Sequence, residues 1–180
     1  MIYVVEGIDR CGKTSFIDIL RSKITNPKIL VIHSAKPPKN VDPKSWSIEY
    51  YDQLISRAIF LSEEGFDVIL DRAWLGEMVY GPIYRNTNIS LNRIEEQLFS
   101  FEDIFKLFLF IDSPENALSR EDGNSISDKI EHKRQEIESF INAFNGSTVL
   151  DKTLVDWSNT EFNNDFLNKL ADKAIENEQN

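Results

Sequence analysis

The chain has 180 residues and a net charge of −10 at pH 7, and 41% of its residues are hydrophobic while 28% are charged. This composition fits one globular domain that is long enough to bury a core. The negative charge argues against nonspecific binding to nucleic acid or anionic membranes, because proteins that bind them carry basic surfaces. Cys11 is the single cysteine, which excludes an intrachain disulfide and a cysteine-rich metal site.

The apolar runs of the sequence are short. No stretch approaches the roughly 20 apolar residues that a membrane-spanning helix needs. The first run has no basic region before it and stops at Glu6, so a secretory signal is not predicted. We therefore expect a cytoplasmic protein, in the host cytoplasm if the source is viral, without a membrane partner.

A phosphate-binding motif follows directly on the first predicted strand, residues 2–6. Residues 7–14 match the P-loop pattern G-x-x-x-x-G-K-[ST]. The glycines let backbone N–H groups turn inward around phosphate oxygens, and the helix predicted from Ser15 adds further donors. Lys13 supplies a charge for the β- and γ-phosphates, and the Thr14 hydroxyl can bind Mg²⁺. The predicted nucleoside triphosphate site comprises Gly7, Asp9, Arg10, Cys11, Gly12, Lys13, Thr14 and Ser15.

Apolar strands alternate with amphipathic helices along the rest of the chain. Further strands are predicted at 28–33, 68–70, 105–111 and 148–150, and helices at 15–24, 46–61, 74–80, 90–101, 130–144 and 161–175. Ser113 and Pro114 predict one more helix start, and Gly81-Pro82 is expected to end the helix that begins at Trp74. The pattern predicts an α/β fold of three layers, a five-stranded parallel sheet flanked by helices, in one domain over 1–180 with a polar tail at about 176–180.

The expected sheet brings several polar segments together. Ligands in parallel sheets bind at the carboxyl ends of the strands, which places 7–14, 33–36, 71–72 and the segment after Ile111 along one rim. A carboxylate at Asp71 can hold a Mg²⁺-bound water, and the guanidinium after it can bind a second phosphate group bidentately. Donor and acceptor phosphates would then face each other across one metal, as phosphoryl transfer requires. The sequence has no Asn-Lys-x-Asp motif, which argues against a GTPase switch.

These residues resemble the thymidylate kinases and related deoxynucleoside monophosphate kinases, a family with the P-loop NTPase fold. Residues 6–14 are similar to the family's E-G-x-D-x-x-G-K-[ST] motif, and Asp71-Arg72 is similar to its D-R signature. The resemblance implies that Asp9 bonds the 3′-hydroxyl of the acceptor and that Arg10 contacts the transferred γ-phosphoryl. It also implies that Arg72 binds the acceptor monophosphate.

The resemblance extends to later parts of the chain. Residues 75–82 look closest to short viral members, in which Tyr80 would lie near the sugar and discriminate against a 2′-hydroxyl, although a core position fits it equally well. Arg120 would reach the donor phosphates or adenine from a lid at about 119–128. Lys36 stands where the family carries an arginine after its second strand. Candidates for reading the base are Trp46, Tyr50, Tyr51 and Arg57.

The sequence therefore predicts transfer of the γ-phosphoryl group of ATP–Mg²⁺ to a deoxynucleoside monophosphate, first of all dTMP, for dNTP synthesis. The expected catalytic residues are Arg10, Lys13, Arg72 and Arg120, the acceptor ligands Asp9, Lys36, Tyr50, Arg57, Arg72 and Tyr80, and the metal ligands Thr14 and Asp71. A deoxynucleoside or polynucleotide 5′-hydroxyl is the alternative acceptor and needs a general base, Asp71 or Glu6. A nucleotide-dependent switch module is a further alternative. Since family members often dimerise, the resemblance also implies a homodimer.

Overall fold

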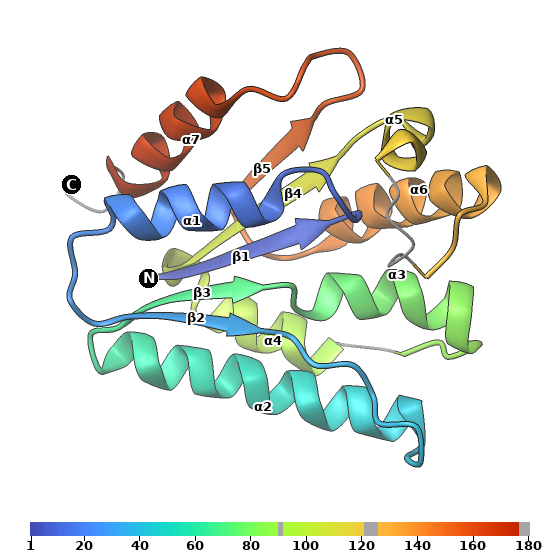
Figure 1. Ribbon diagram of the computed structural model, residues 1–180. Coiled ribbons are helices and arrows are strands. Elements are labelled where there is room, and N and C mark those ends of the chain that lie inside the picture. Colours follow the sequence, from blue (N-terminus) through green and yellow to red (C-terminus); the bar gives the residue numbers. More distant parts are fainter. Residues whose placement is uncertain (90–91, 121–125, 177–180) are drawn as a thin grey trace.

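The sheet has five parallel strands within the residues that the computed structural model describes, which are 1–89, 92–120 and 126–176. The strands are β1 (Ile2–Gly7), β2 (Ile29–His33), β3 (Asp67–Asp71), β4 (Phe105–Ile111) and β5 (Asp151–Asp156). Their order is β2-β3-β1-β4-β5, and each neighbouring pair is parallel. All five arrows in Figure 1 point to the same side, so the loops at the carboxyl ends lie along one rim. The predicted five-stranded parallel sheet is confirmed.

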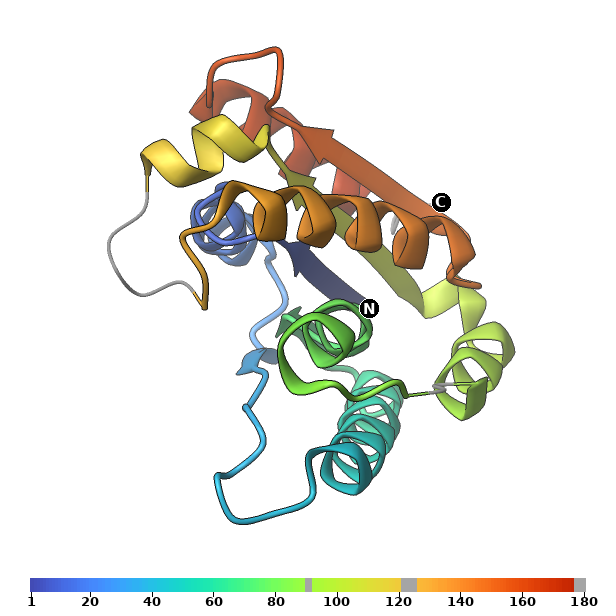
Figure 2. The ribbon, with the colours of Figure 1, turned by 90° about the vertical axis from the view of Figure 1, so that its right-hand side faces the viewer.

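Helices cover both faces of this sheet. They are α1 (Lys13–Lys23), α2 (Pro43–Glu63), α3 (Trp74–Arg85), α4 (Asn92–Ser100), α5 (Pro114–Ser119), α6 (Ile130–Gly146) and α7 (Asn164–Glu176), with a 3₁₀ turn at Glu102–Ile104. Helix α1 packs against α7, whereas α3 lies between α6 and α2 (Figure 2). The two helix groups and the sheet form the three predicted layers. None of the described helices is long and apolar enough to cross a membrane.

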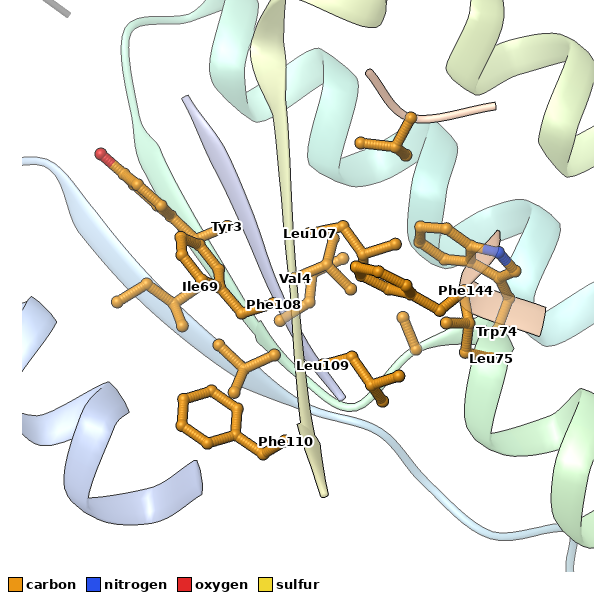
Figure 3. Packing of buried hydrophobic residues seen from close by; sticks show 14 of the residues in the cluster. Tyr3, Val4, Ile69, Trp74, Leu75, Leu107, Phe108, Leu109, Phe110 and Phe144 are labelled. Carbon is orange, nitrogen blue, oxygen red and sulfur yellow. The ribbon is translucent and has the colours of Figure 1, made fainter. Parts of the chain in front are cut away.

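The core is built around the central strand β1 and its neighbour β4, because every residue of these two strands is buried. Side chains alternate along β4, as the two-residue period of a strand requires. Phe108 and Phe110 point toward α1, where their rings lie 4.9 and 5.3 Å from the ring of Phe16. Leu107 and Leu109 point the other way, toward side chains of α3 and α6 (Figure 3). The apolar run that predicts this strand thus supplies both faces of the core.

Helix α3 is longer than the sequence predicts. The expectation that Gly81-Pro82 ends the helix is wrong, since the helix continues through Pro82 to Arg85 and ends at Asn86 with φ 50°. Proline removes one backbone hydrogen bond and usually breaks a helix. Here the last turn is held from elsewhere, because Arg85 pairs with Glu77 at 2.5 Å and α3 packs along α6. Tertiary contacts therefore override the local signal.

The fifth strand lies three residues later than predicted. Residues 148–150 precede it, and the strand itself is Asp151–Asp156. The Thr148 backbone N–H and hydroxyl both donate to the Glu95 carboxylate at 2.7 Å. That contact with α4 takes the backbone of Thr148 out of the sheet, so pairing with β4 begins only at Asp151. The prediction was wrong because the deciding partner is far away in sequence.

Candidate active site

The loop between β1 and α1 folds through three residues with positive φ, namely Gly7 at 132°, Arg10 at 63° and Gly12 at 90°. At Gly7 a Cβ atom would lie 1.9 Å from the Phe110 carbonyl oxygen, so only glycine allows this approach to β4. Helix α1 begins at Lys13, directly after Gly12. The free N–H groups of its first turn therefore face the loop, which is the geometry that binds anions.

Buried contacts hold this loop in place from the core side. The Cys11 thiol donates to the carbonyl oxygens of Ile8 at 2.8 Å and Phe110 at 3.1 Å. The Trp157 indole N–H donates to the Cys11 carbonyl at 2.9 Å. Burial raises the pKa of the Cys11 thiol, although nearby Lys13 opposes the shift. Cys11 is thus a structural part of the loop, and only its backbone is available to a phosphate.

Lys13 is mostly buried, and its ammonium group donates to the Ile8 carbonyl oxygen. Burial lowers the pKa of Lys13, because a charged amine is disfavoured away from water. A bound polyphosphate would oppose that shift by stabilising the charged form. Lys13, Arg10 and Thr14 line one cavity together with Asp71 and Arg72, and they line a second cavity toward α5. The P-loop therefore stands between two cavities.

The first of these has a volume of about 420 Å³ and is here called the acceptor cavity, after the role that is proposed for it below. Of the four predicted rim segments, those at 7–14, 33–36 and 71–72 contribute to its lining. The fourth segment, after β4, does not, because Asp112 lines other cavities. Its lining comprises Asp9, Arg10, Lys13, Thr14, His33, Ser34, Ala35, Lys36, Pro37, Tyr51, Asp71, Arg72, Ala73, Gly76, Glu77, Tyr80, Arg85 and Ile126. The opening of α3 and its last residue both contribute, so the cavity follows this helix.

Several contacts hold Arg72 in the acceptor cavity. Its guanidinium pairs with Asp9 and donates to the Gly7 carbonyl at 3.1 Å and the Tyr80 hydroxyl at 3.3 Å. The same group lies 5.7 Å from the centre of the Tyr80 ring. The Arg72 backbone has φ 67°, a conformation that costs an ordinary residue energy and is typical of functional sites. The contacts aim a planar set of donors at the space beside the P-loop.

Asp71 and Thr14 offer oxygen ligands to the same cavity. The Asp71 carboxylate lies 2.7 Å from Nδ1 of His33, which leaves its other oxygen for a metal or for water. Mg²⁺ usually keeps several waters and takes only one or two protein ligands beside substrate phosphates. Within the described ranges no group of three His, Cys, Asp or Glu side chains could hold a metal by itself. One hydroxyl and one carboxylate therefore fit Mg²⁺ that arrives with a nucleotide.

Glu6 lies beneath the cavity and does not line it. Its carboxylate accepts from the backbone N–H groups of Ala73 at 2.7 Å and Gly76 at 3.1 Å. Burial raises the pKa of Glu6, and the charge of Arg72 opposes the shift. The bonds fix the first turn of α3 against β1. Glu6 thus positions Arg72 and Gly76, and the predicted alternative role as a general base gains no support from its location.

Two further cavities continue from the P-loop toward β5. The nearer one, about 420 Å³, lies beside Arg10, Lys13 and Thr14 and reaches Arg120 and Phe162. The farther one, about 500 Å³, shares Arg120 and Phe162 and is also lined by residues 157–161. Arg120 pairs with the buried Asp112 carboxylate and donates to the Asn116 carbonyl at 3.2 Å. A long ligand can therefore extend from the P-loop past Arg120.

The structure gathers most of the residues that the sequence predicts for the site. Lys36 and Tyr80 line the acceptor cavity together with Asp9 and Arg72. Tyr50 and Arg57 do not line it. The Tyr50 hydroxyl accepts from the Ala35 N–H at 2.8 Å, its ring stacks on Trp46, and Arg57 is exposed on α2. Of the predicted lid, residues 121–125 lie outside the described residues, as do 177–180 of the predicted tail.

Sequence reasoning missed several residues of these cavities, among them two pairs of side chains. Glu77 and Arg85 line the acceptor cavity, and Trp157 and Phe162 border the cavities beyond Arg120. Helix spacing could have indicated Glu77 and Arg85, because residues separated by steps of four positions lie on about the same face of a helix. Nothing local marks Trp157 and Phe162, which reach the P-loop only through the fold of the chain after β5.

Comparison with known proteins gives one sequence relative. No family model matches the chain. A protein of Acidianus bottle-shaped virus named "Putative thymidylate kinase" is 29% identical over 101 residues, which cover 56% of this chain. The match covers 60% of the viral protein, so the chain spans less than two thirds of the relative's length.

Solved structures resemble the whole chain. The YorR protein of Bacillus subtilis, solved in complex with phosphorylated GDP, has a TM-score of 0.73 at 16% identity and covers 99% of this chain and 98% of its own. The thymidylate kinase of Candida albicans has a TM-score of 0.60 at 18% identity, and the match covers 99% of this chain and 92% of the Candida chain. The chain shares the fold of these proteins. The deoxyadenosine kinase of M. mycoides also shares this fold, with a TM-score of 0.55 at 13% identity. The match covers 98% of this chain and 99% of that kinase.

These findings bear on the resemblance predicted from the sequence. The predicted resemblance to thymidylate kinases and related kinases is confirmed, in that the sequence relative carries that name and the solved kinases share the fold. The three-layer fold class is confirmed by the same comparison. The likeness concerns architecture, so the reaction has to be argued from the side chains of this chain.

Proposed function

We propose that the protein transfers the γ-phosphoryl group of ATP–Mg²⁺ to a deoxynucleoside monophosphate, with dTMP as the leading acceptor. One observation carries this proposal: two cavities meet at the P-loop and share Arg10, Lys13 and Thr14. A kinase needs a donor site and an acceptor site that open on the same reacting phosphate. A protein that only binds a nucleotide needs one.

The donor would occupy the P-loop and the cavities that follow it. Its β- and γ-phosphates would accept from the loop N–H groups, from the first turn of α1 and from Lys13. Its base would lie beyond Arg120, where Phe162 offers an aromatic surface. Thr14 and Asp71 would hold Mg²⁺ beside the phosphates, and the ion would neutralise charge that builds up during transfer.

The acceptor would place its monophosphate against Arg72. A planar guanidinium binds phosphate oxygens bidentately, and Asp9 and Tyr80 hold this one in position. Asp9 would also accept from the sugar, and Tyr80 would lie close to it. Arg10, which lines both cavities, would stabilise the phosphoryl group between donor and acceptor.

A monophosphate acceptor needs no general base, because its oxygens are already deprotonated near neutral pH. This suits the site, since Glu6 is buried under the start of α3 and Asp71 is bonded to His33. A hydroxyl acceptor would have to lose its proton to Asp71. The name of the viral relative supports thymidylate as the acceptor, and deoxynucleosides are the alternative to be tested.

A coupled assay of ADP formation tests the proposal with the purified chain, ATP–Mg²⁺ and a panel of deoxynucleoside monophosphates and deoxynucleosides. Transfer to at least one monophosphate is expected, and Arg10→Met should depress it strongly. Arg21→Met, on the exposed side of α1, is the matched control and should leave transfer unchanged. Activity with deoxynucleosides alone would replace the proposal with a hydroxyl kinase. ADP formation that no acceptor stimulates would refute both.

A further inference from the structure

The Cys11 carbonyl oxygen is held from outside the P-loop. The Trp157 indole N–H donates to it at 2.9 Å, across 146 positions of the chain, and both residues are buried. The hydrogen-bond ladder of α1 begins one residue later, where the Phe16 N–H donates to the Gly12 carbonyl at 3.0 Å. The direction of the Cys11 carbonyl is therefore set by a side chain from beyond β5 and not by the helix.

The Trp157 indole is itself fixed by the sheet and by two aromatic rings. Trp157 follows β5 directly, and its backbone N–H donates at 3.1 Å to the carbonyl of Ile111, the last residue of β4. The rings of Phe162 and Phe166 each lie 5.4 Å from the indole ring. The donor of this hydrogen bond is thus attached to the rigid sheet, whereas its acceptor belongs to a loop.

The bond orients the peptide unit between Cys11 and Gly12. A trans peptide unit is planar, so its C=O and N–H groups point in opposite directions. Because the Cys11 carbonyl faces the buried indole, the Gly12 N–H faces away from it. Gly12 has no side chain, so it lines the cavity between the P-loop and Arg120 with backbone atoms only. This N–H is therefore one that the loop can offer to a phosphate in that cavity.

Glycine makes the same peptide unit easy to turn. Gly12 has φ 90°, and glycine adopts positive and negative φ about equally readily. A turned peptide would take the Gly12 N–H away from the phosphates and bring the Cys11 carbonyl oxygen toward them, where it would repel them. The turn would also break the indole bond and leave a buried carbonyl without its donor, which is costly. Trp157 therefore disfavours the turned peptide.

We propose that Trp157 is a positioning residue for the phosphates of the donor, because its indole N–H keeps the Gly12 N–H in the orientation that binds them. In this role Trp157 touches neither substrate and acts through one peptide unit of the P-loop. The inference rests on the proposed function in one respect, namely that the P-loop holds the donor's phosphates. It follows that loss of the indole N–H alone weakens the donor.

Calorimetric titrations of Trp157→Phe test this role with two ligands, Mg²⁺–ATP and Mg²⁺–tripolyphosphate, which has no base. The variant keeps an aromatic ring and loses the N–H group. Its affinity for both ligands should fall by the same factor, about tenfold to a hundredfold, as expected for one hydrogen bond to a charged group. In the transfer assay the loss should fall on the KM for ATP, since the contact exists before and during transfer. The KM for the monophosphate should stay unchanged.

Two control variants separate positioning from packing and from base stacking. Trp74→Phe removes an indole hydrogen bond of the same kind, to Glu95 at 3.0 Å, from a ring that is also buried. It should lower the unfolding temperature and leave both affinities unchanged. Phe162→Ala removes the aromatic surface proposed for the base and keeps the indole bond, so it should weaken ATP and change tripolyphosphate little. Thermal unfolding shows whether each variant is folded at the assay temperature.

A measurement on the wild-type protein needs no change at Trp157. The chain has three tryptophans, so a spectrum of isotope-labelled indole nitrogens contains three N–H signals. Trp46→Phe and Trp74→Phe each remove one signal and so assign the third to Trp157. A phosphate on the Gly12 N–H polarises the peptide that the indole binds, so tripolyphosphate should shift this signal, as ATP does. A Trp157 signal that tripolyphosphate leaves in place overturns the inference.

The possible failures are distinguishable. Unchanged binding of tripolyphosphate by Trp157→Phe, or an equal loss in Trp74→Phe, overturns the role of Trp157 and leaves the kinase intact. A wild-type protein that binds ATP but not tripolyphosphate overturns it too, because the phosphates then contribute too little to be positioned. Binding that depends on Trp157 without transfer to any acceptor refutes the proposed function and keeps the positioning role. If the wild-type protein binds neither ligand, both fail.

Discussion

Arg72 gives the sharpest test of the proposed reaction. Its side chain touches Asp9, Gly7 and Tyr80, and none of these three residues lines the cavity that runs from the P-loop to Arg120 and Phe162. Arg72→Ala therefore removes the acceptor's phosphate ligand and leaves Lys13 and the first turn of α1 intact. We expect phosphoryl transfer to fall while ATP binding stays close to that of the wild-type protein.

The size of the effect follows from the contacts. A guanidinium that binds a phosphate bidentately makes two hydrogen bonds between charged groups, about 3–6 kcal/mol in total. This corresponds to a loss of about a hundredfold to ten-thousandfold in kcat/KM for the monophosphate. The folded protein should lose about 1–3 kcal/mol, near the lower end because Asp9 is 33% exposed and can be rehydrated.

Backbone geometry supplies a matched variant. The φ of Arg72 is 67°, which glycine adopts freely and alanine does not. Arg72→Gly should be more stable than Arg72→Ala by about 1 kcal/mol, yet both should lose transfer to the same extent. Steady-state kinetics, ATP titration and thermal unfolding of the two variants measure the three quantities. A fall in ATP affinity as large as the fall in transfer would refute the reasoning and move Arg72 to the donor side.

Three further predictions concern the P-loop and its surroundings. Gly7→Ala should abolish soluble expression or lower the unfolding temperature sharply, because the added Cβ would lie 1.9 Å from the Phe110 carbonyl oxygen. A variant as stable as the wild-type protein would contradict the close approach of Gly7 to β4. Burial raises the pKa of Glu6 above its ordinary 4.5, so the native state binds more protons and the free energy of unfolding should fall as pH rises through that raised value. Denaturant titrations of Glu6→Gln should show a flatter pH profile, and an unchanged slope would mean that another group titrates. Phe162→Ala should raise the KM for ATP by about tenfold through loss of base stacking and leave the KM for the monophosphate unchanged. A higher KM for the monophosphate with an unchanged KM for ATP would place the base of ATP elsewhere.

The parts of the site that sequence predicted are those whose chemistry is local. Residues 7–14 form one continuous loop, and its glycines, Lys13 and Thr14 are required wherever a P-loop occurs. Asp71 and Arg72 end a strand, and the rule for parallel sheets places strand ends on the ligand rim. The apolar runs of β1 and β4 likewise predict two buried strands, because a strand covered on both faces has no other pattern.

Contacts between distant segments decided the rest. Helix α3 continues through Pro82 because Arg85 reaches back to Glu77 and the helix packs on α6, and no nearest-neighbour signal contains either contact. Strand β5 begins only at Asp151 because the Thr148 backbone N–H donates to the Glu95 carboxylate on α4 and not to a neighbouring strand. The sequence alone determined a P-loop, a parallel sheet and a second arginine on its rim. Only the tertiary structure decided which side chains enclose the acceptor, since a cavity is formed by residues that meet in space and not along the chain.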